Sequence, residues 1–288
     1  MCRFIGYLGN DILLADILSR PENSLIRQSL KAKERPEPVN GDGFGLGWYT
    51  PEISGDPCVF TAITPAWSNR NLLNLIEHTR SRCFFAHIRA ASPGMRVSEA
   101  NCHPFQFGRF LWMHNGTIEG FDLIKRRLRQ SLPDDIYRSI NGTTDSEHAF
   151  AVFMNLLEER SGVTSAAVLA DGLVKTIWQL EGWAADAGIK TPSIYNFAVT
   201  DGCNIATIRY VSDDAIEPIS LYVSKRGKCD AFHGEWETMT DCFAETNGIV
   251  VSSERLTDQI GGWTRVEPNR VVLIDNKLNV DVRAVTDF

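Results

Sequence analysis

The sequence predicts an α+β fold in which β-sheets are covered by helices. Segments with strand character cluster towards the two ends of the 288-residue chain, and segments with helical periodicity fill its middle. Strands and helices grouped in this way are typical of a layered α+β domain, because a doubly wound α/β fold alternates the two along the chain. Hydrophobic residues make up 43% and charged residues 23% of the chain, as in an ordinary globular protein.

The first half of the chain holds five strand-like segments. The second of them is rich in glycine, with Gly43, Gly45 and Gly47 alternating with larger residues. Glycines inside a strand typically mark a bulge or a place where another part of the chain packs closely. The expected strands are 2–9, 43–50, 57–63, 83–88 and 109–114.

Six more strand-like segments follow the middle of the chain. Asp201-Gly202 is a strong signal for a β-hairpin, because these residue types accept the positive φ angles of a tight turn. The turn at Asp275-Asn276 joins the last two strands in a similar way. The expected strands are 194–200, 204–211, 218–223, 249–252, 271–274 and 280–285.

Helices are expected over 68–80, 121–131, from 144 to about 157, and over 163–187. Ser68 is a plausible N-cap of the first helix, with Leu72, Leu73 and Ile76 on one face. In the second helix, Leu123, Ile124 and Leu128 share a face in the same way. The third begins at Thr144-Asp145-Ser146-Glu147, which has the spacing of a capping box.

Charge and composition exclude several classes of protein. A net charge of −7 argues against a nucleic-acid partner, and the basic run 125–129 is interpreted as a solvated helix face. No apolar run approaches the roughly 20 residues of a membrane span. The first residues lack the charged and apolar segments of a signal peptide, so we expect a cytoplasmic protein without a membrane partner.

Cofactor and metal signatures are missing from the sequence. It contains no P-loop, no dinucleotide-binding glycine pattern and no Gly-x-Ser-x-Gly motif. His87, His103, His114 and His148 have no zinc-ligand spacing to one another or to cysteines. Seven dispersed cysteines without a Cys-x-x-Cys pair favour reduced thiols over a disulfide framework. We therefore expect neither a cofactor nor a metal.

Cys2 is the first candidate for chemistry. It follows Met1 directly, and cysteine is small enough for the initiator methionine to be removed. The new N-terminal residue would carry a thiol together with an α-amine whose pKa of about 8 suits a base. A nucleophile activated by its own N-terminal amine is an established arrangement. The alternative is that Cys2 is merely a small residue at the start of a strand.

Three further motifs carry polar groups at the ends of predicted elements. Arg89 follows a short apolar strand and could bind a carboxylate through its planar fork. Asn115-Gly116 could supply a side-chain amide and a backbone N–H to an oxyanion, or form an ordinary turn. Asp145 places a carboxylate at a helix start, where it could equally serve only the helix dipole. Cys102-His103 is the alternative pair for a nucleophile and its base.

In this order the motifs resemble the class II glutamine amidotransferases, which are N-terminal-nucleophile hydrolases. The matching segments, with the run 252–254 as a later extension, are Met1-Cys2, 40–49, 87–89, 114–116 and 144–147. The resemblance implies a four-layer αββα sandwich that forms a single domain over 2–288. The chain is most similar to stand-alone members of the kind that occur in glutathione degradation and ergothioneine biosynthesis.

The resemblance also implies a role for each candidate residue. Cys2 would attack a γ-glutamyl amide, and Asn115 and Gly116 would stabilise the oxyanion. Arg89 would hold the α-carboxylate of the substrate, and Asp145 its α-ammonium. The alternative is an inactive glutamine-binding or scaffold subunit of a larger complex. A partner peptidase or synthase subunit is compatible with either function, and the residues do not identify the leaving group.

Overall fold

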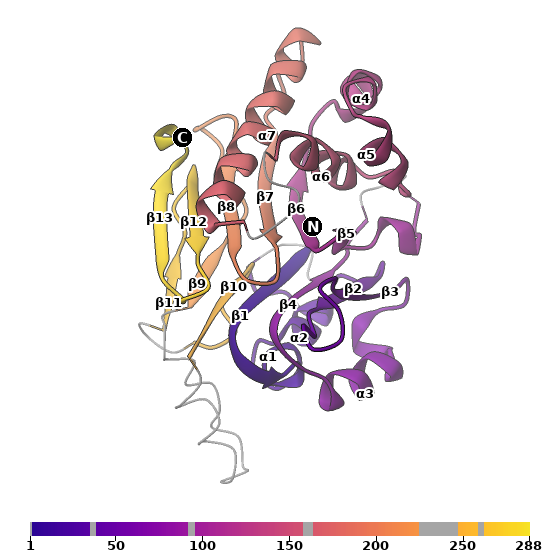
Figure 1. Cartoon of the computed structure of the whole chain (residues 1–288), viewed down its shortest axis with the longest axis vertical. Helices are drawn as coiled ribbons and strands as arrows, with labels where there is room; N and C mark the ends of the chain where they lie inside the picture. Colours follow the sequence, from indigo (N-terminus) through magenta and orange to yellow (C-terminus); the bar gives the residue numbers. More distant parts are fainter. Residues whose placement is uncertain (1, 35–38, 92–95, 158–163, 225–246, 259–261) are drawn as a thin grey trace.

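The computed structural model describes residues 2–34, 39–91, 96–157, 164–224, 247–258 and 262–288. Within these ranges the strands form two antiparallel sheets (Figure 1). The first sheet has the order β11-β9-β10-β1-β4-β2-β3. Its strands are β1 (Arg3–Leu13), β2 (Phe44–Trp48), β3 (Cys58–Ala62), β4 (Arg80–Ile88), β9 (Tyr222–Ser224), β10 (Gly248–Ser252) and β11 (Trp263–Arg265).

The second sheet has the order β13-β12-β8-β7-β6-β5. The Asp201-Gly202 turn joins β7 to β8 as the sequence predicts, with Gly202 at φ +88°. Its strands are β5 (Phe105–Phe107), β6 (Phe110–Thr117), β7 (Ile194–Thr200), β8 (Ile205–Val211), β12 (Arg270–Ile274) and β13 (Val280–Ala284).

Helices cover the outer face of each sheet, which makes four layers. The helices α1 (Ala15–Leu18), α2 (Leu25–Leu30) and α3 (Arg70–His78) pack on the first sheet. The helices α4 (Phe121–Gln130), α5 (Asp134–Ser139), α6 (Asp145–Leu156) and α7 (Ala166–Asp186) form the layer on the second sheet (Figure 1). Short 3₁₀ turns complete the elements at η1 (Ala66–Ser68), η2 (Glu99–Asn101) and η3 (Val285–Asp287).

Side-chain alternation along the strands explains this layering. In β6, Leu111 and Met113 belong to a core between the sheets, whereas Trp112 belongs to the core under α6 and α7. In β1, Phe4 faces the second sheet and Ile5 faces the helices of the first layer. Because successive side chains of a strand point to opposite faces, both faces of each sheet are buried. The expected four-layer αββα sandwich is confirmed.

Most of the predicted elements are found within a few residues of their expected bounds. The glycine-rich strand packs closely, as expected: a Cβ on Gly45 would lie 2.0 Å from the carbonyl oxygen of His103. No sequence pattern predicted α1, α2, α5, β5 and β11. Each of them has six residues or fewer, which is too short for a periodic pattern. The strand expected over 218–223 begins only at Tyr222.

Several local predictions are wrong. Asn69, and not Ser68, caps α3, since its side chain accepts from the N–H of Leu72 at 2.8 Å. Leu123 is 70% exposed and Leu73 is 37% exposed, so neither belongs to the buried helix face on which we placed it. In each helix one apolar residue therefore faces solvent beside the buried stripe.

Only one of the two hydrogen bonds of the predicted capping box forms at the start of α6. The Thr144 hydroxyl accepts from the N–H of Glu147 at 3.1 Å, as expected. The Glu147 carboxylate instead accepts from the backbone of Asn141 and Gly142, both at 2.7 Å. Glu147 therefore fixes the loop that leads into the helix. None of the helices in the described ranges has the length and apolar character that crossing a membrane requires.

Candidate active site

A buried ion pair holds the N-terminal strand in place. Arg3 Nε donates to Glu254 Oε1 at 2.8 Å, and both side chains are only 1% exposed. Arg3 Nη1 also donates to the backbone carbonyl of Cys2 at 2.8 Å. Glu254 further accepts from the backbone N–H groups of Lys33 and Glu34, at 2.9 and 3.2 Å. The Arg3 side chain, held by Glu254, thus fixes the position of Cys2 directly before β1 through its hydrogen bond to the Cys2 carbonyl.

The Glu254 carboxyl remains ionised in this environment. Burial acts to raise its pKa, but the N–H of Lys33 and the charge of Arg3 outweigh that effect. The pKa of Glu254 consequently lies below its ordinary value. With four donors around it, from Arg3, Asn23, Lys33 and Glu34, the carboxylate balances the buried Arg3 cation without becoming protonated.

The thiol of Cys2 lies against the end of β4. Its Sγ is 3.6 Å from the carbonyl oxygen of Ala90 and 3.5 Å from the Ala90 nitrogen. Cys2 is partly exposed. Burial of the sulfur raises the pKa of the thiol, so the uncharged thiol dominates near neutral pH. A nucleophile in this state needs a base in the reaction itself.

Arg89 precedes Ala90 and is a buried cation that lacks a full set of partners. Its side chain is 3% exposed, and Nη2 donates to the carbonyl of Arg96 at 3.1 Å. Nη1 is buried with no hydrogen-bond partner in the described part of the chain. Because a buried charge without a counter-charge is costly, this guanidinium is suited to an anionic group that arrives from outside.

Asp145 supplies the opposite charge at the start of α6. Its Oδ2 accepts from the N–H of Ile118 at 3.0 Å, and its Oδ1 accepts from the N–H of Ser146 at 2.7 Å. The residue is partly exposed, so lone pairs of its carboxylate remain accessible. The Ser146 hydroxyl lies 2.9 Å from His114 Nδ1, which ties this helix start to β6.

Asn101 connects the segments of the two charged residues, a role that no sequence motif predicted. Its Nδ2 donates to the Arg96 carbonyl at 3.1 Å, the same oxygen that Arg89 binds. Its Oδ1 accepts from the N–H of Thr143 at 2.9 Å, two residues before Asp145. Asn101 is 2% exposed. Its only signal in the sequence is its position directly before the Cys102-His103 pair.

Asn115 and Gly116 lie near the end of β6, not in a turn. Asn115 is fully buried, and its Nδ2 lies 3.4 Å from Ser253 Oγ. Ser253 Oγ also accepts from the N–H of Phe4 at 3.0 Å, which connects Asn115 to the strand of Cys2. A Cβ on Gly116 would lie 2.0 Å from the carbonyl oxygen of Ile194, so no larger residue fits here.

The structure does not support the alternative pair Cys102-His103. Cys102 is 3% exposed, its Sγ faces the carbonyls of Ser98 and Ala62, and burial raises the pKa of its thiol to about 11. Neither ring nitrogen of His103 has a hydrogen-bond partner among the described residues. The His103 ring instead packs between the rings of His87 and Phe105, tilted against both. Among the residues that the structure describes, the Cys102 thiol contacts backbone carbonyls and no base.

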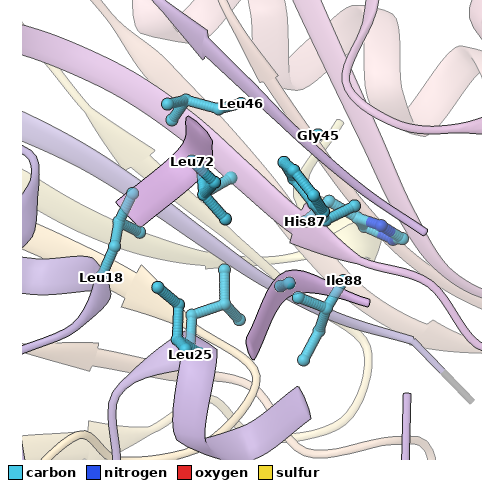
Figure 2. Close-up of a pocket in the computed structure, with 11 residues that line it drawn as sticks. Leu18, Leu25, Gly45, Leu46, Leu72, His87 and Ile88 are labelled. Carbon is cyan, nitrogen blue, oxygen red and sulfur yellow. The ribbon is translucent and has the colours of Figure 1, made fainter. Parts of the chain in front are cut away.

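Two of the hollows described in the structure lie near these residues, and Cys102 lines the second of them. One cavity of about 20 Å³ lies between the helices α1 and α2 and the first sheet, and its mostly apolar lining includes Leu18, Leu25 and Leu72. Figure 2 shows the His87 ring directed away from that leucine cluster. A groove of about 290 Å³ lies between β3, β5 and α6. Neither hollow is lined by Cys2, Arg89 or Asn115.

We expect Glu254→Gln to lower the free energy of unfolding at pH 7 by about 3–5 kcal/mol, because Arg3 would then be buried without a counter-charge. The folded-state pKa of Glu254 is depressed, so its contribution is complete above the ordinary pKa of about 4.3 and is lost as pH falls through the folded value. The difference from the wild type should shrink accordingly in acid, as measured by urea unfolding.

The matched control is Asp11→Asn, which removes the carboxylate of the exposed ion pair with Arg80. Exposed pairs contribute about 0–1 kcal/mol, so this variant should unfold almost like the wild type. Equal losses in both variants would contradict a special role for the buried pair.

The sequence of this chain is similar to those of known proteins over most of its length. The family model of class II glutamine amidotransferases matches residues 24–284. "Probable glutamine amidotransferase DUG3" of Saccharomyces cerevisiae is 38% identical over 293 residues, which span 95% of this chain and 82% of the yeast protein. A gamma-glutamyl-hercynylcysteine sulfoxide hydrolase of Mycolicibacterium smegmatis is 31% identical over 41% of this chain and 52% of its own length.

The similarity extends to a solved structure. A glutamine aminotransferase class-II domain protein of Silicibacter pomeroyi superposes with a TM-score of 0.66 and 25% identity, covering 98% of this chain and 99% of that one. The sequence match spans nearly the whole described fold. On these grounds the chain belongs to the class II glutamine amidotransferase family.

Proposed function

We propose that this chain hydrolyses a γ-glutamyl amide through a thioester on Cys2. One observation carries the proposal: the Cys2 sulfur contacts Ala90, the residue next to the buried Arg89, whose Nη1 has no partner in the described structure. The thiol of Cys2 therefore lies against the residue that follows Arg89, and the Arg89 cation can accept an anionic group of a substrate. The name of the mycobacterial relative, a hydrolase of a γ-glutamyl compound, supports the same reaction class.

The reaction needs a base, and the α-amine of Cys2 would supply it once Met1 is removed. The thiol attacks the γ-carbonyl carbon while its proton passes to the α-amine. The carbon–nitrogen bond then breaks, and the leaving amine takes that proton. The α-amine of Cys2 next accepts a proton from water, whose oxygen attacks the thioester. As the carbon–sulfur bond breaks, the α-ammonium returns that proton to the Cys2 sulfur, and the glutamyl product leaves with a free γ-carboxyl group. Protons balance over the cycle without a cofactor.

Asn115 and Gly116 would stabilise the oxyanion of each tetrahedral intermediate. Donors of this kind are effective because they are already oriented when the charge develops. Asn115 is fully buried on β6, in hydrogen-bond contact with Ser253, which in turn binds the strand of Cys2. Rigid strands on both sides would thus hold the nucleophile and the oxyanion donor in a constant relation.

Arg89 and Asp145 would bind the amino-acid end of the substrate. A free glutamyl head carries one carboxylate and one ammonium, which need one fixed cation and one fixed anion. Asn101 bridges the carbonyl that orients Arg89 and the loop that precedes Asp145. This bridge would set the separation of the two charges to that of the head group.

The alternative function is an inactive glutamine-binding or scaffold subunit. Binding the glutamyl head would require only Arg89 and Asp145. A thiol at Cys2 and an amide at Asn115 serve no purpose in such a protein, and both are present. We therefore prefer the enzymatic function, with a small γ-glutamyl compound as substrate.

We expect Cys2→Ala to abolish turnover while folding and substrate binding remain largely intact. An electrophilic glutamine analogue should label Cys2, and active protein should begin at this residue, as measured by intact mass and peptide mapping. Cys102→Ala is the matched control and should keep both the label and the activity. Labelling of Cys102, or full activity in protein that retains Met1, would contradict the mechanism.

For the head-group contacts, we expect Arg89→Lys to raise KM by about tenfold or more, because lysine keeps the charge but loses the planar fork. Asp145→Asn should lower kcat/KM strongly for substrates with a free α-ammonium and much less for their N-acetyl analogues. Steady-state kinetics on paired substrates measures both effects. Equal losses for the two substrate types would refute the ammonium contact.

The identity of the leaving group distinguishes a glutaminase from a hydrolase of larger γ-glutamyl compounds. Hydrolysis of glutamine alone releases ammonia, which is useful only if a partner synthase receives it. We therefore expect the chain, alone or with a peptidase-type partner, to cleave a γ-glutamyl peptide or thiol with a higher kcat/KM than glutamine. A preference for glutamine of about tenfold or more, or 1.4 kcal/mol, would instead indicate an ammonia-supplying subunit.

A further inference from the structure

Ser253 is a buried hydroxyl that none of the proposed catalytic steps uses. It follows β10, is 1% exposed, and pairs through its backbone N–H with the carbonyl of Phe4 at 3.1 Å. Its Oγ accepts from the N–H of Phe4 at 3.0 Å and lies 3.4 Å from Nδ2 of Asn115. The hydroxyl proton of Ser253 therefore needs an acceptor, since both of these neighbours are donors.

The Asn115 amide lacks a hydrogen-bond donor for its oxygen, whereas the Ser253 hydroxyl lacks an acceptor for its proton. With Nδ2 towards Ser253, its Oδ1 is fully buried and has no hydrogen-bond partner in the described structure. The oxygen and the nitrogen of a side-chain amide occupy nearly equal space, so the hydrogen bonds around it decide which way it points. A half-turn of the amide would bring Oδ1 to the Ser253 hydroxyl, which then donates to it, and would satisfy both groups at once.

A neighbouring residue favours the same half-turn. Asn196 lies directly opposite Asn115 in the pairing of β6 with β7, and it is fully buried. Its Nδ2 donates to the carbonyls of Ile219 and Ser220, at 2.9 and 3.4 Å, which fixes its orientation. Its Oδ1 is left without a partner in the described structure. Side chains of directly opposed residues share a sheet face, so this face offers an acceptor to a turned Asn115.

We propose that Ser253 is a positioning residue that holds Asn115 with Oδ1 towards its own hydroxyl and with Nδ2 free for the reacting oxygen. This inference rests on the proposed function, in which Asn115 is an oxyanion donor. In this orientation one Nδ2 hydrogen serves Asn196 and the other serves the substrate. Ser253 also binds the N–H of Phe4, so the same hydroxyl relates the oxyanion donor to the strand that carries Cys2.

The first test is kinetic. Removal of an oxyanion donor costs about 100- to 1,000-fold in kcat. Ser253→Ala frees that donor to turn away, so it should lower kcat by about tenfold or more and leave KM within about twofold. Ser252→Ala is the matched control, because its hydroxyl donates to the Glu254 carbonyl one residue away and takes no part in this network. That variant should keep kcat within about twofold of the wild type.

A double-mutant cycle separates positioning from a general loosening of the strand. If Ser253 acts through Asn115, then Ser253→Ala should change kcat by less than about threefold when Asn115 is already alanine. Alkylation of Cys2 by iodoacetamide should proceed at the wild-type rate in Ser253→Ala. An equal loss of kcat in both backgrounds, or unchanged kcat in the single variant, would overturn the proposal.

A measurement without turnover keeps the inference separate from the proposed function. With ¹⁵N-labelled asparagine in the wild-type protein, nuclear Overhauser effects from the Asn115 Nδ2 protons should be stronger to the Asn196 side chain than to the β-protons of Ser253. The reverse order would overturn the proposed orientation even in a fully active enzyme. If no γ-glutamyl compound is hydrolysed, the function fails, and this result still decides the orientation.

Discussion

The ion pair between Arg3 and Glu254 is the constraint on which the candidate site depends. It joins the start of β1 to the end of β10, residues 251 positions apart, and it has almost no exposure to solvent. An N-terminal residue would ordinarily fray, because it has chain on only one side. Here the charge of Glu254, the backbone donors of the segment before β2 and the flanking strands hold residue 2 in place. The proposed function would require Cys2 to hold a fixed position, and this paired buried charge would provide it.

The second feature of the site is an imbalance of charge that folding leaves in place. Arg89 is buried with one nitrogen that has no partner within the described ranges, whereas Arg3, on the neighbouring strand, is paired with a carboxylate. Stability alone would favour a counter-charge at both positions. The difference is understandable if the counter-charge of Arg89 comes with the substrate. The Asn101 amide then fixes the distance between the two charges, because it binds both the Arg96 carbonyl that contacts Arg89 and the loop before Asp145.

Local sequence patterns were sufficient for most of the fold. The helices α6 and α7 and the hairpin of β7 and β8 are long or carry specific cap and turn residues, so their signals are local. The short elements α1, α2, α5, β5 and β11 were missed, because their stability comes from packing rather than from periodicity. Leu123 was misplaced for a related reason: a hydrophobic residue next to a buried stripe can face solvent at little cost.

The sequence by itself determined which residue types were available for chemistry: a thiol after the initiator methionine, an arginine after a strand, an Asn-Gly pair and an aspartate at a helix start. It also indicated the α+β class, because alternation and helical periodicity are properties of neighbouring residues. Only the tertiary structure decided that Glu254 anchors Arg3, that Asn101 links Arg89 to the loop before Asp145, and that Ser253 contacts Asn115. These contacts join residues distant in the sequence, and their partners are set by sheet order and register, which no local pattern encodes.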